Sequence, residues 1–431
     1  MVNKKFRFVG LLACLLAAVF LSACASGGAD DKYYFAEKEQ VTMSQAYTGG
    51  EVSFPQSLWS EPSVTESGLE SILGENALLE TSDSRIRPIL YKGVSYGGKQ
   101  TEVFAYVGFP EGASEDKPVP GVVLVHGGEG TAFWDWVQMW LDKGYAAIAM
   151  DTEGRFPTVG SEMATGYRAL LPEDIRGPQN SGYYADASSE PSEQWMYHAV
   201  ASVIAANSYL RSCPQVDADS IGMVGVSWGG VICSIANIYD DRFAFAAPIY
   251  GTLNMAGTSC NFGNIYAASE RAASLWDNGT PLSQCSTPTF YVNGGDDYHF
   301  NVQGTFRSAA DTANSRVLVR RTLQHSQYSA ACVEEVFLFA DHVVRRSQPF
   351  INIAAQPTAE EPVLKLDVPQ GVTVEEAELL YCEQENAASW KTVTLEAGEE
   401  IALQIPQTAK FFFVNITDSN GFSFSTALRE V

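Results

Sequence analysis

The sequence is poor in basic residues, and its cysteines and histidines form no metal-binding pattern. Among its 431 residues, 27 are Lys or Arg and 51 are Asp or Glu, which gives a net charge of −24. This sign argues against nucleic acid as a partner, because binding to a phosphate backbone is driven by basic side chains that release counterions. No CxxC motif or Cys/His cluster with zinc spacing occurs among its 8 Cys and 5 His, so the sequence predicts no metal site.

Long apolar runs are also scarce, and the one near the N-terminus is too short to span a bilayer comfortably. Residues 1–23 combine a basic start, an apolar run and small residues before Cys24, which is typical of a secretory signal peptide. The sequence LSAC at 21–24 resembles a bacterial lipobox and so predicts lipidation of Cys24. We therefore expect an extracytoplasmic protein held to the membrane by acyl chains. A plain secretory signal with an incidental cysteine is the alternative.

Length and composition indicate a folded chain with more than one domain. The sequence is 46% hydrophobic and 12% aromatic, which excludes a mainly disordered protein. Single cores stop growing at roughly 250–300 residues, and this chain is longer. The predicted division is a signal peptide at 1–23, a tether or linker at 24–83 with a short helix around 69–79, an α/β domain at 84–352, a linker at 353–362 and a small β-sandwich-like domain at 363–431.

The large domain alternates short apolar runs with amphipathic stretches. The apolar runs predict strands at 103–108, 121–125, 146–150, 221–226, 244–249, 289–292 and 317–323. The amphipathic stretches predict helices at 132–143, 193–210, 228–239, 264–276 and 332–345. Several strands are apolar throughout, as expected when both faces of a parallel sheet are covered. This alternation predicts a doubly wound, mostly parallel α/β fold.

The C-terminal part has a different pattern. Short β-rich runs are spaced evenly at 363–366, 378–381, 392–395, 401–403, 411–414 and 422–426, and DSNG at 418–421 is a hairpin signal. No catalytic grouping occurs there. We expect structural support or contact with a ligand.

A candidate nucleophile lies within GVSWG at 225–229, between a predicted strand and a predicted helix. This is the G-x-S-x-G nucleophile elbow in its expected context. Ser227 is the nucleophile, and Gly225 and Gly229 leave room for the sharp turn. A serine hydroxyl needs a base, and in this type of fold the acid and then the histidine follow the serine in the chain.

Three histidines follow Ser227. His342 falls inside a predicted amphipathic helix, and His299 is too close in sequence to the candidate acid to face it. His325 follows a predicted strand, at the edge of the sheet where catalytic groups of open α/β folds gather. We therefore predict His325 as the base. The acid should also follow a strand, and spacing alone does not choose between Asp296 and Asp297.

The oxyanion of the reaction intermediate needs backbone N–H donors. One is expected from Trp228, directly after the nucleophile, and the other from Gly128 in HGGEG at 126–130, a variant of the HGGG loop. Gly127 lets the backbone approach the substrate, and His126 is expected to orient the loop. Glu129 is expected to point to solvent and leave its amide available.

These motifs resemble the α/β-hydrolase superfamily, and more narrowly bacterial acetyl xylan esterases, cephalosporin-C deacetylases and dienelactone hydrolases. The resemblance covers residues 86–350, including VLVHGG at 123–128, the elbow, and VNGGDDYHF at 292–300. In the last segment the aspartate before the aromatic residue matches the acid of that group, which favours Asp297. The run around His325 matches the histidine loop of the group. Trp228 after the nucleophile and VHG at 125–127 depart from the Gln and the Tyr-His-Gly loop usual in acetyl xylan esterases, and so weaken an assignment to xylan.

Together with the predicted lipidation at Cys24, the resemblance implies a surface-anchored serine esterase that removes acyl groups, with acetyl the expected one, from an extracellular carbohydrate or related small ester without a cofactor. A serine peptidase of the prolyl oligopeptidase type and a non-catalytic glycan-binding lipoprotein are the alternatives. The remaining cysteines leave pairing open, with Cys260 and Cys285 a possible bridge in an oxidising compartment and Cys233 a buried thiol.

Overall fold

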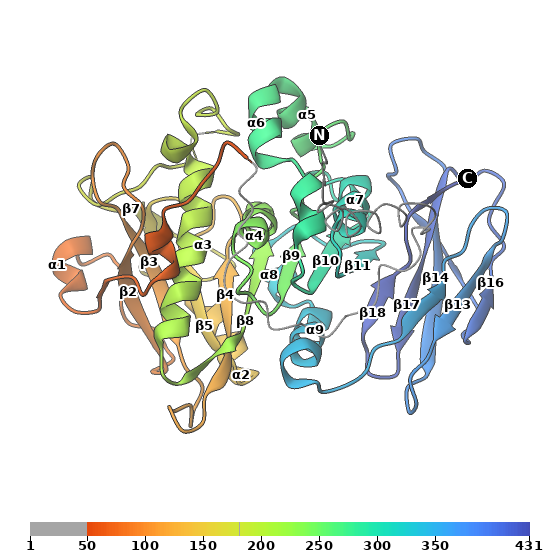
Figure 1. The fold of residues 1–431 in the computed structure, drawn as a ribbon, viewed down its shortest axis with the longest axis horizontal. Helices are drawn as coiled ribbons and strands as arrows, with labels where there is room; N and C mark the ends of the chain where they lie inside the picture. The colour runs from red at the N-terminus through yellow and green to blue at the C-terminus, as the bar shows by residue number, and fades with distance from the viewer. Residues whose placement is uncertain (1–49, 181) are drawn as a thin grey trace, which may run out of the picture.

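A computed structural model describes residues 50–180 and 182–431 (Figure 1). The predicted signal peptide at 1–23, the lipidation site Cys24 and the first part of the predicted tether lie outside these residues. Within the described part of the chain, no helix combines the length and the apolar character needed to cross a bilayer.

A nine-stranded sheet forms the centre of the larger part of the molecule, in the order β1-β2-β3-β5-β4-β8-β9-β10-β11. The first three strands are antiparallel to their neighbours, and those from β5 onward are parallel. Their bounds are Val64–Thr65 (β1), Ile86–Lys92 (β2), Glu102–Gly108 (β3), Val119–Val125 (β4), Ala146–Met150 (β5), Val216–Val226 (β8), Ala246–Ile249 (β9), Thr289–Gly294 (β10) and Ser315–Arg320 (β11). The predicted doubly wound, mostly parallel sheet is confirmed.

Helices cover both faces of this sheet. The helices of the large domain are Trp134–Asp142 (α2), Trp195–Ser212 (α3), Trp228–Tyr239 (α4), Asn261–Ala268 (α5), Glu270–Trp276 (α6), Val302–Asp311 (α7), Gln327–Ala331 (α8) and Glu334–Arg345 (α9), with 3-10 turns at Pro191–Glu193 and Thr280–Gln284. Leu210 of α3 lies over Gly121 on one face, and Leu141 of α2 lies over Gly108 on the other. The helix predicted at 264–276 is divided because the Ser269 hydroxyl accepts the amide of Ala272 and begins α6.

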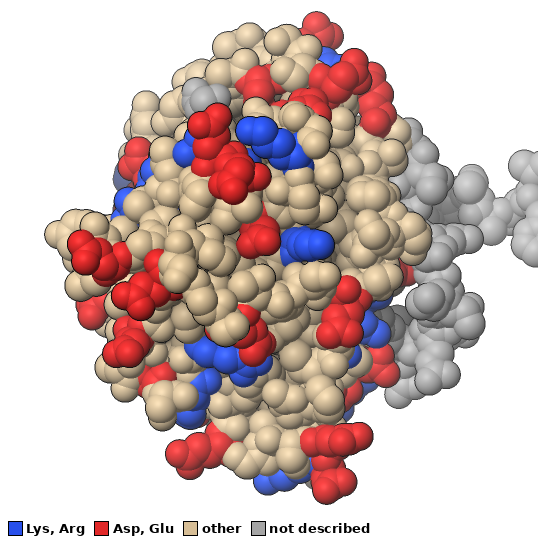
Figure 2. All heavy atoms as spheres, turned by 90° about the vertical axis from the view of Figure 1, so that its left-hand side faces the viewer, with Lys and Arg blue, Asp and Glu red and all other residues tan. Residues whose placement is uncertain are grey.

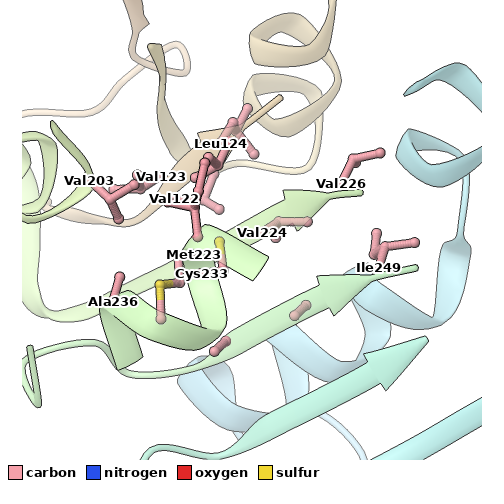
Figure 3. Close-up of a cluster of buried hydrophobic side chains, with 14 of the residues drawn as sticks. Val122, Val123, Leu124, Val203, Met223, Val224, Val226, Cys233, Ala236 and Ile249 are labelled. Atoms are coloured by element: carbon pink, nitrogen blue, oxygen red, sulfur yellow. The ribbon is translucent and has the colours of Figure 1, made fainter. Parts of the chain in front are cut away.

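The core lies between β4, β8, α3 and α4 (Figure 3). Side chains from the sheet and from the two helices meet there, and every one that the figure labels is less than 2% exposed: Val122, Val123, Leu124, Val203, Met223, Val224, Val226, Cys233, Ala236 and Ile249. Burial on both faces explains the uninterrupted apolar runs of these strands.

Residues 50–83 do not form the predicted tether. They contain a 3-10 turn at Gln56–Trp59, the edge strand β1 and the short helix α1 at Leu69–Leu73. Val52, Leu58 and Leu69 are each at most 5% exposed and pack into the main core. Their irregular spacing gives no periodic signal, so burial of this segment could not be read from the sequence.

Two antiparallel sheets follow the large domain (Figure 1). One contains Asn352–Ala355 (β12), Val363–Asp367 (β13) and Glu400–Ala402 (β16), and the other contains Val374–Cys382 (β14), Lys391–Thr394 (β15), Phe411–Asp418 (β17), Ser423–Ser425 (β18) and Arg429–Glu430 (β19). Because β12 pairs with β13, the linker predicted at 353–362 begins only after Ala355.

The C-terminal sheets adjoin the free edge of the nine-stranded sheet. The amide of Val319 in β11 donates to the Ser425 hydroxyl over 2.9 Å, and the Asn415 amide group donates to the Val319 carbonyl over 2.9 Å. These side chains satisfy backbone groups that an edge strand otherwise leaves open. Phe306 of α7 and Phe413 of β17 also share one buried apolar cluster, so the two parts of the chain are packed as one body.

The surface around the β1 edge carries charges of both signs (Figure 2). Acidic side chains are spread over this face with basic ones between them, and no continuous basic patch is visible there. All six cysteines in the described residues are free thiols. Cys260 caps α5 by accepting the amide of Gly263, and Cys285 lies against the carbonyl of Asn237, so the bridge considered between them is absent.

Candidate active site

Ser227 lies on a sharp turn between β8 and α4. Its backbone has φ 55° and ψ −117°, a conformation that is strained for any residue with a side chain. A Cβ at Gly225 would lie 2.1 Å from the Gly229 carbonyl oxygen, and one at Gly229 would lie 2.1 Å from the Val125 carbonyl oxygen. Both glycines are therefore required by close backbone approach, as in a nucleophile elbow.

The structure brings Ser227, His325 and Asp297 together. The His325 Nε2 atom is 2.9 Å from the Ser227 Oγ, and its Nδ1 atom is 2.7 Å from the Asp297 Oδ2. The Asp297 side chain is fully buried, and its Oδ1 accepts the amides of His299 and Phe300 over 2.7 and 2.9 Å. These bonds fix the carboxylate so that its second oxygen faces the imidazole.

The neighbouring carboxylate is used differently. Asp296 Oδ1 accepts the amide of Leu323 over 3.2 Å and thereby joins the loops after β10 and β11. Spacing in the sequence does not choose between the two aspartates, but the structure gives them different partners. Asp297 faces His325, and Asp296 joins the loops after β10 and β11.

Aromatic rings hold the plane of His325. Tyr250 stacks on it with ring centroids 4.6 Å apart, and the Tyr250 hydroxyl donates to the Gln324 carbonyl over 2.6 Å. His299 lies 4.7 Å away on another side, and burial together with the nearby His325 lowers the pKa of His299. His342, by contrast, stacks on Phe350 with ring centroids 4.1 Å apart, and its Nδ1 atom contacts the Gln348 carbonyl.

Two backbone amides beside Ser227 have no hydrogen-bond acceptor in the described part of the chain. They belong to Trp228, the first residue of α4, and to Gly128. The two residues are adjacent, since a Cβ at Gly128 would lie 2.4 Å from the Trp228 indole. Unpaired amides next to a nucleophile are the donors that an oxyanion requires.

Sequence reasoning missed the side chain that engages Gly127. The Gln327 Oε1 atom accepts the Gly127 amide over 3.2 Å, and its buried Nε2 has no partner among the described residues. Gln327 begins α8 and so connects the loop of His325 to the loop of Gly128. Its position two residues after the histidine is the only signal in the sequence, and that signal is weak.

The buried side chain of His126 supports the loop that contains Gly127 and Gly128. His126 is 1% exposed; its Nε2 accepts the amide of Thr152 over 3.0 Å, and its Nδ1 contacts the Gly127 carbonyl at 2.6 Å. These partners require a neutral ring that donates through Nδ1. The expectation for Glu129 was wrong in one respect: its amide is not available, because it donates to Glu153 Oε1 over 3.2 Å.

Glu153 is itself 4% exposed and ion-pairs with Arg168 at 3.0 Å. Burial raises the pKa of this carboxyl, while Arg168 opposes the rise. Arg168 also donates to the Gly130 carbonyl over 2.5 Å, so the pair holds both ends of the loop segment after Gly128. Among the described residues no group of three or more His, Cys, Asp or Glu could hold a metal ion.

Residues 70–262 match the family model described as "Acetyl xylan esterase (AXE1)". Among curated proteins, the chain is 27% identical over 142 residues to a probable dipeptidyl-peptidase 5 from Emericella nidulans, covering 31% of this chain and 16% of that protein. The chain therefore spans less than a fifth of the length of that relative.

Solved structures with a similar arrangement include two esterases. An acetyl xylan esterase from Paenibacillus sp. R4 is 18% identical, covers 63% of this chain and 95% of that one, and has a TM-score of 0.44. A glucuronoyl esterase of carbohydrate esterase family 15 from Caldicellulosiruptor kristjansonii is 15% identical, covers 69% of this chain and 82% of that one, and has a TM-score of 0.45.

The sheet order and the sharp turn at Ser227 give the large domain the fold of an α/β hydrolase. Within that fold class, residues 70–262 are similar to acetyl xylan esterases.

Proposed function

We propose that Ser227, His325 and Asp297 form a catalytic triad that hydrolyses acyl esters, with acetyl the expected acyl group. Ser227 attacks the ester carbonyl while His325 takes its proton, and His325 then protonates the leaving alcohol. Asp297 holds the imidazole in one tautomer and stabilises its charged form. The amides of Gly128 and Trp228 bind the oxyanion, each contributing about 3 kcal/mol to stabilisation of the transition state.

The observation that carries this proposal is the continuous chain of two short contacts from Asp297 through His325 to Ser227. Both ring nitrogens of His325 are used, at 2.7 and 2.9 Å, and the serine has the strained backbone of an elbow. A buried histidine that serves only packing needs neither a hydroxyl nor a carboxylate in line with its two nitrogens.

Release of acetate from acetylated xylooligosaccharides tests the proposal, measured for the wild type and for Ser227→Ala. We expect turnover by the wild type and a loss of about 10⁴-fold or more in the variant. A fluorophosphonate probe should label the wild type at Ser227 and leave the variant unlabelled. Equal rates in the two proteins would remove Ser227 from the reaction.

The proposed substrate is an ester of an extracellular carbohydrate. The family match to acetyl xylan esterases supports the sugar, and the N-terminal signal and Cys24 support the location. In a bacterial host, Cys24→Ser should move the protein from the membrane fraction to the soluble extracytoplasmic fraction. Retention of that variant on the membrane would contradict lipidation at Cys24.

A serine peptidase is the second candidate, because the curated relative is a probable dipeptidyl-peptidase. The same triad can cleave amides, so geometry near Ser227 does not separate the two reactions. Parallel assays with a dipeptidyl p-nitroanilide and an acetylated sugar decide between them. A higher kcat/KM on the anilide would favour the peptidase.

A further inference from the structure

Exposed aromatic rings are confined to one region of the described chain. The aromatic side chains that are more than half exposed are Tyr298, Tyr328, Tyr167 and Tyr183, at 72%, 59%, 57% and 55%. Tyr298 follows β10 and Tyr328 follows β11, while Tyr167 and Tyr183 lie in the long segment between β5 and α3. The carboxyl ends of the parallel strands lie at one edge of the sheet, where Ser227 follows β8. Large rings of this kind are normally half-covered, so their concentration at one edge calls for an explanation.

Tyr298 belongs to the loop that carries the triad acid. It directly follows Asp297, and its carbonyl accepts the amide of Asn261 over 3.1 Å, which fixes the backbone beneath the ring. The ring lies 5.5 Å from that of His299, and His299 lies 4.7 Å from His325. The ring of Tyr298 is thus connected to that of His325 through His299, and it is itself exposed to solvent.

Tyr328 belongs to the loop that carries the base. It follows Gln327, whose side chain holds the Gly127 amide beside Ser227. Tyr328 lies in the short helix α8, whose first turn is capped by the Ser326 hydroxyl. The backbone of this tyrosine is therefore ordered, yet its ring makes no aromatic contact in the described part of the chain.

The chemistry of the proposed reaction distinguishes the two sides of Ser227. The leaving alcohol departs next to His325, because this imidazole must protonate it. The loops that carry Asp297 and His325 each present an exposed tyrosine: Tyr298 directly follows the acid, and Tyr328 comes three residues after the base. A tyrosine offers a rigid, amphipathic face at a small cost in conformational entropy.

We propose that Tyr298 and Tyr328 form a subsite that stacks on a pyranose ring of the substrate's alcohol, adjacent to the ester bond. This inference rests on the proposed esterase function. The aromatic ring next to Ser227 in the chain is not available for stacking, because Trp228 is 6% exposed and packs between Phe262 and Tyr184 with centroid distances of 4.6 and 5.2 Å. Sugar recognition is therefore assigned to the alcohol side.

The C-terminal sheets supply no comparable surface. Within residues 352–431, every aromatic side chain is buried or half-buried, including Trp390 at 6% exposure. A glycan-binding module usually needs open rings on which sugars stack. The exposed rings thus favour sugar contact at the edge that carries Ser227.

The test compares a substrate whose alcohol is a sugar chain with one whose alcohol has no ring. Tyr298→Ala and Tyr328→Ala are assayed on acetylated xylooligosaccharides and on ethyl acetate, and the ratio of the two kcat/KM values is recorded. We expect each variant to lower this ratio about three- to tenfold. Tyr298→Phe keeps the ring and should keep the ratio, as should Val393→Ala, an exposed position on β15. An unchanged ratio in both alanine variants would overturn the subsite.

A binding experiment separates this inference from the proposed function. Ser227→Ala is titrated with the same oligosaccharides by calorimetry, alone and combined with Tyr298→Ala or Tyr328→Ala. Weaker binding in the combined variants supports the subsite even if the wild type fails to release acetate, and such a failure rejects only the esterase proposal. Equal Kd values in all three proteins reject the subsite while leaving any measured esterase activity in place.

Discussion

The carboxyl edge of the nine-stranded sheet and the two C-terminal sheets use backbone strain differently. At the edge, Glu129, Ser227 and Tyr250 have positive φ although none is glycine, and each lies in a turn or loop around the Ser227 hydroxyl. Across described residues 352–431 the only non-glycine residues with positive φ are Ala387 and Ser389. Strain is tolerated where surrounding contacts enforce it, and functional sites are where it collects.

The one strained turn of the C-terminal sheets is also the one that reaches the proposed site. Trp390 follows it, donates its indole N–H to the Ala387 carbonyl over 3.0 Å, and packs against the loop before Asp297. A Cβ at Gly295 would lie 2.6 Å from the Trp390 ring. The C-terminal sheets are therefore not a separate module. Through Trp390 they form a wall against the loop that carries Asp297.

The largest expected effect lies wholly at the carboxyl edge. His325→Ala removes the proposed base and should lower kcat on an acetylated sugar about 10⁴-fold. His342→Ala, on the helix α9 that faces the C-terminal sheets, should leave turnover per folded molecule close to the wild type. Steady-state kinetics on both variants decide the matter. Loss of turnover in His342→Ala with activity kept in His325→Ala would reverse the assignment.

The next effect concerns stability and lies on the C-terminal side. Phe422 is fully buried, stacks on Phe350 at 3.8 Å and lies 5.2 Å from Phe290 of β10. Phe422→Ala should lower the free energy of unfolding by about 3–5 kcal/mol, measured by urea denaturation. Phe422→Leu should cost less, because it fills more of the cavity.

Because the Phe422 cluster spans both parts of the chain, unfolding should remain one transition in the wild type. Two separated transitions, with only the first moved by Phe422→Ala, would show that the C-terminal sheets fold independently. That result would break the conclusion that the two regions form one body.

The central fold can be predicted from the sequence because strands that are buried on both faces have a simple pattern of apolar residues. Continuous apolar runs specify β4, β5 and β8, and the glycine spacing of the elbow specifies the turn at Ser227. Loop order then restricts the histidine, because the carboxyl ends of parallel strands lie at one edge. These inferences need only local patterns and the topology of the sheet.

Contacts between segments that are distant in the chain have no such pattern in the sequence. Gln327 meets Gly127 across 200 positions, and Trp390 meets Gly295 from a different sheet. Neither contact has a periodic signal or a motif. For the same reason the sequence does not link Glu153 to the loop of Gly127 and Gly128, and it predicts a tether at 50–83 where the structure buries several residues.

Trp390 tests whether the C-terminal wall matters for the proposed chemistry. Trp390→Ala should let the loop with Asp297 shift and lower kcat about 10- to 100-fold, because small displacements of a catalytic group are costly. Trp390→Phe keeps a ring against Gly295 and should recover much of the rate. Both variants are assayed well below their unfolding temperatures, since the alanine variant also loses packing. A rate unchanged in Trp390→Ala would make the wall purely structural.

Gln327 should have a smaller effect, because it acts through the Gly127 backbone. Gln327→Ala removes the acceptor and should lower kcat/KM about three- to tenfold. Gln327→Glu keeps an acceptor but places negative charge near the developing oxyanion, so its kcat should fall below that of the alanine variant while KM changes little. The reverse ranking would indicate that Gln327 supports the loop sterically and not through its charge distribution.

The smallest effect on the proposed reaction is expected from two carboxyls that act on stability and its pH dependence: Asp277, which is buried, and Asp83, which is paired with Arg85. Burial raises the pKa of Asp277 to about 7, although its oxygens accept the amides of Met255 and Ala256. The native state therefore keeps this proton between pH 4 and 7 where the unfolded chain has released it, so this group makes the free energy of unfolding fall as pH rises. Hydrogen bonds from Arg85 lower the pKa of Asp83 to about 2, so Asp83 contributes stability that is lost as pH falls from 4 to 2. Asp277→Asn should flatten the slope between pH 4 and 7 in urea titrations, and Asp83→Asn should leave that interval unchanged while flattening the acid limb. A slope between pH 4 and 7 that survives Asp277→Asn must come from another group, and Asp277 would then be ionised in the native protein.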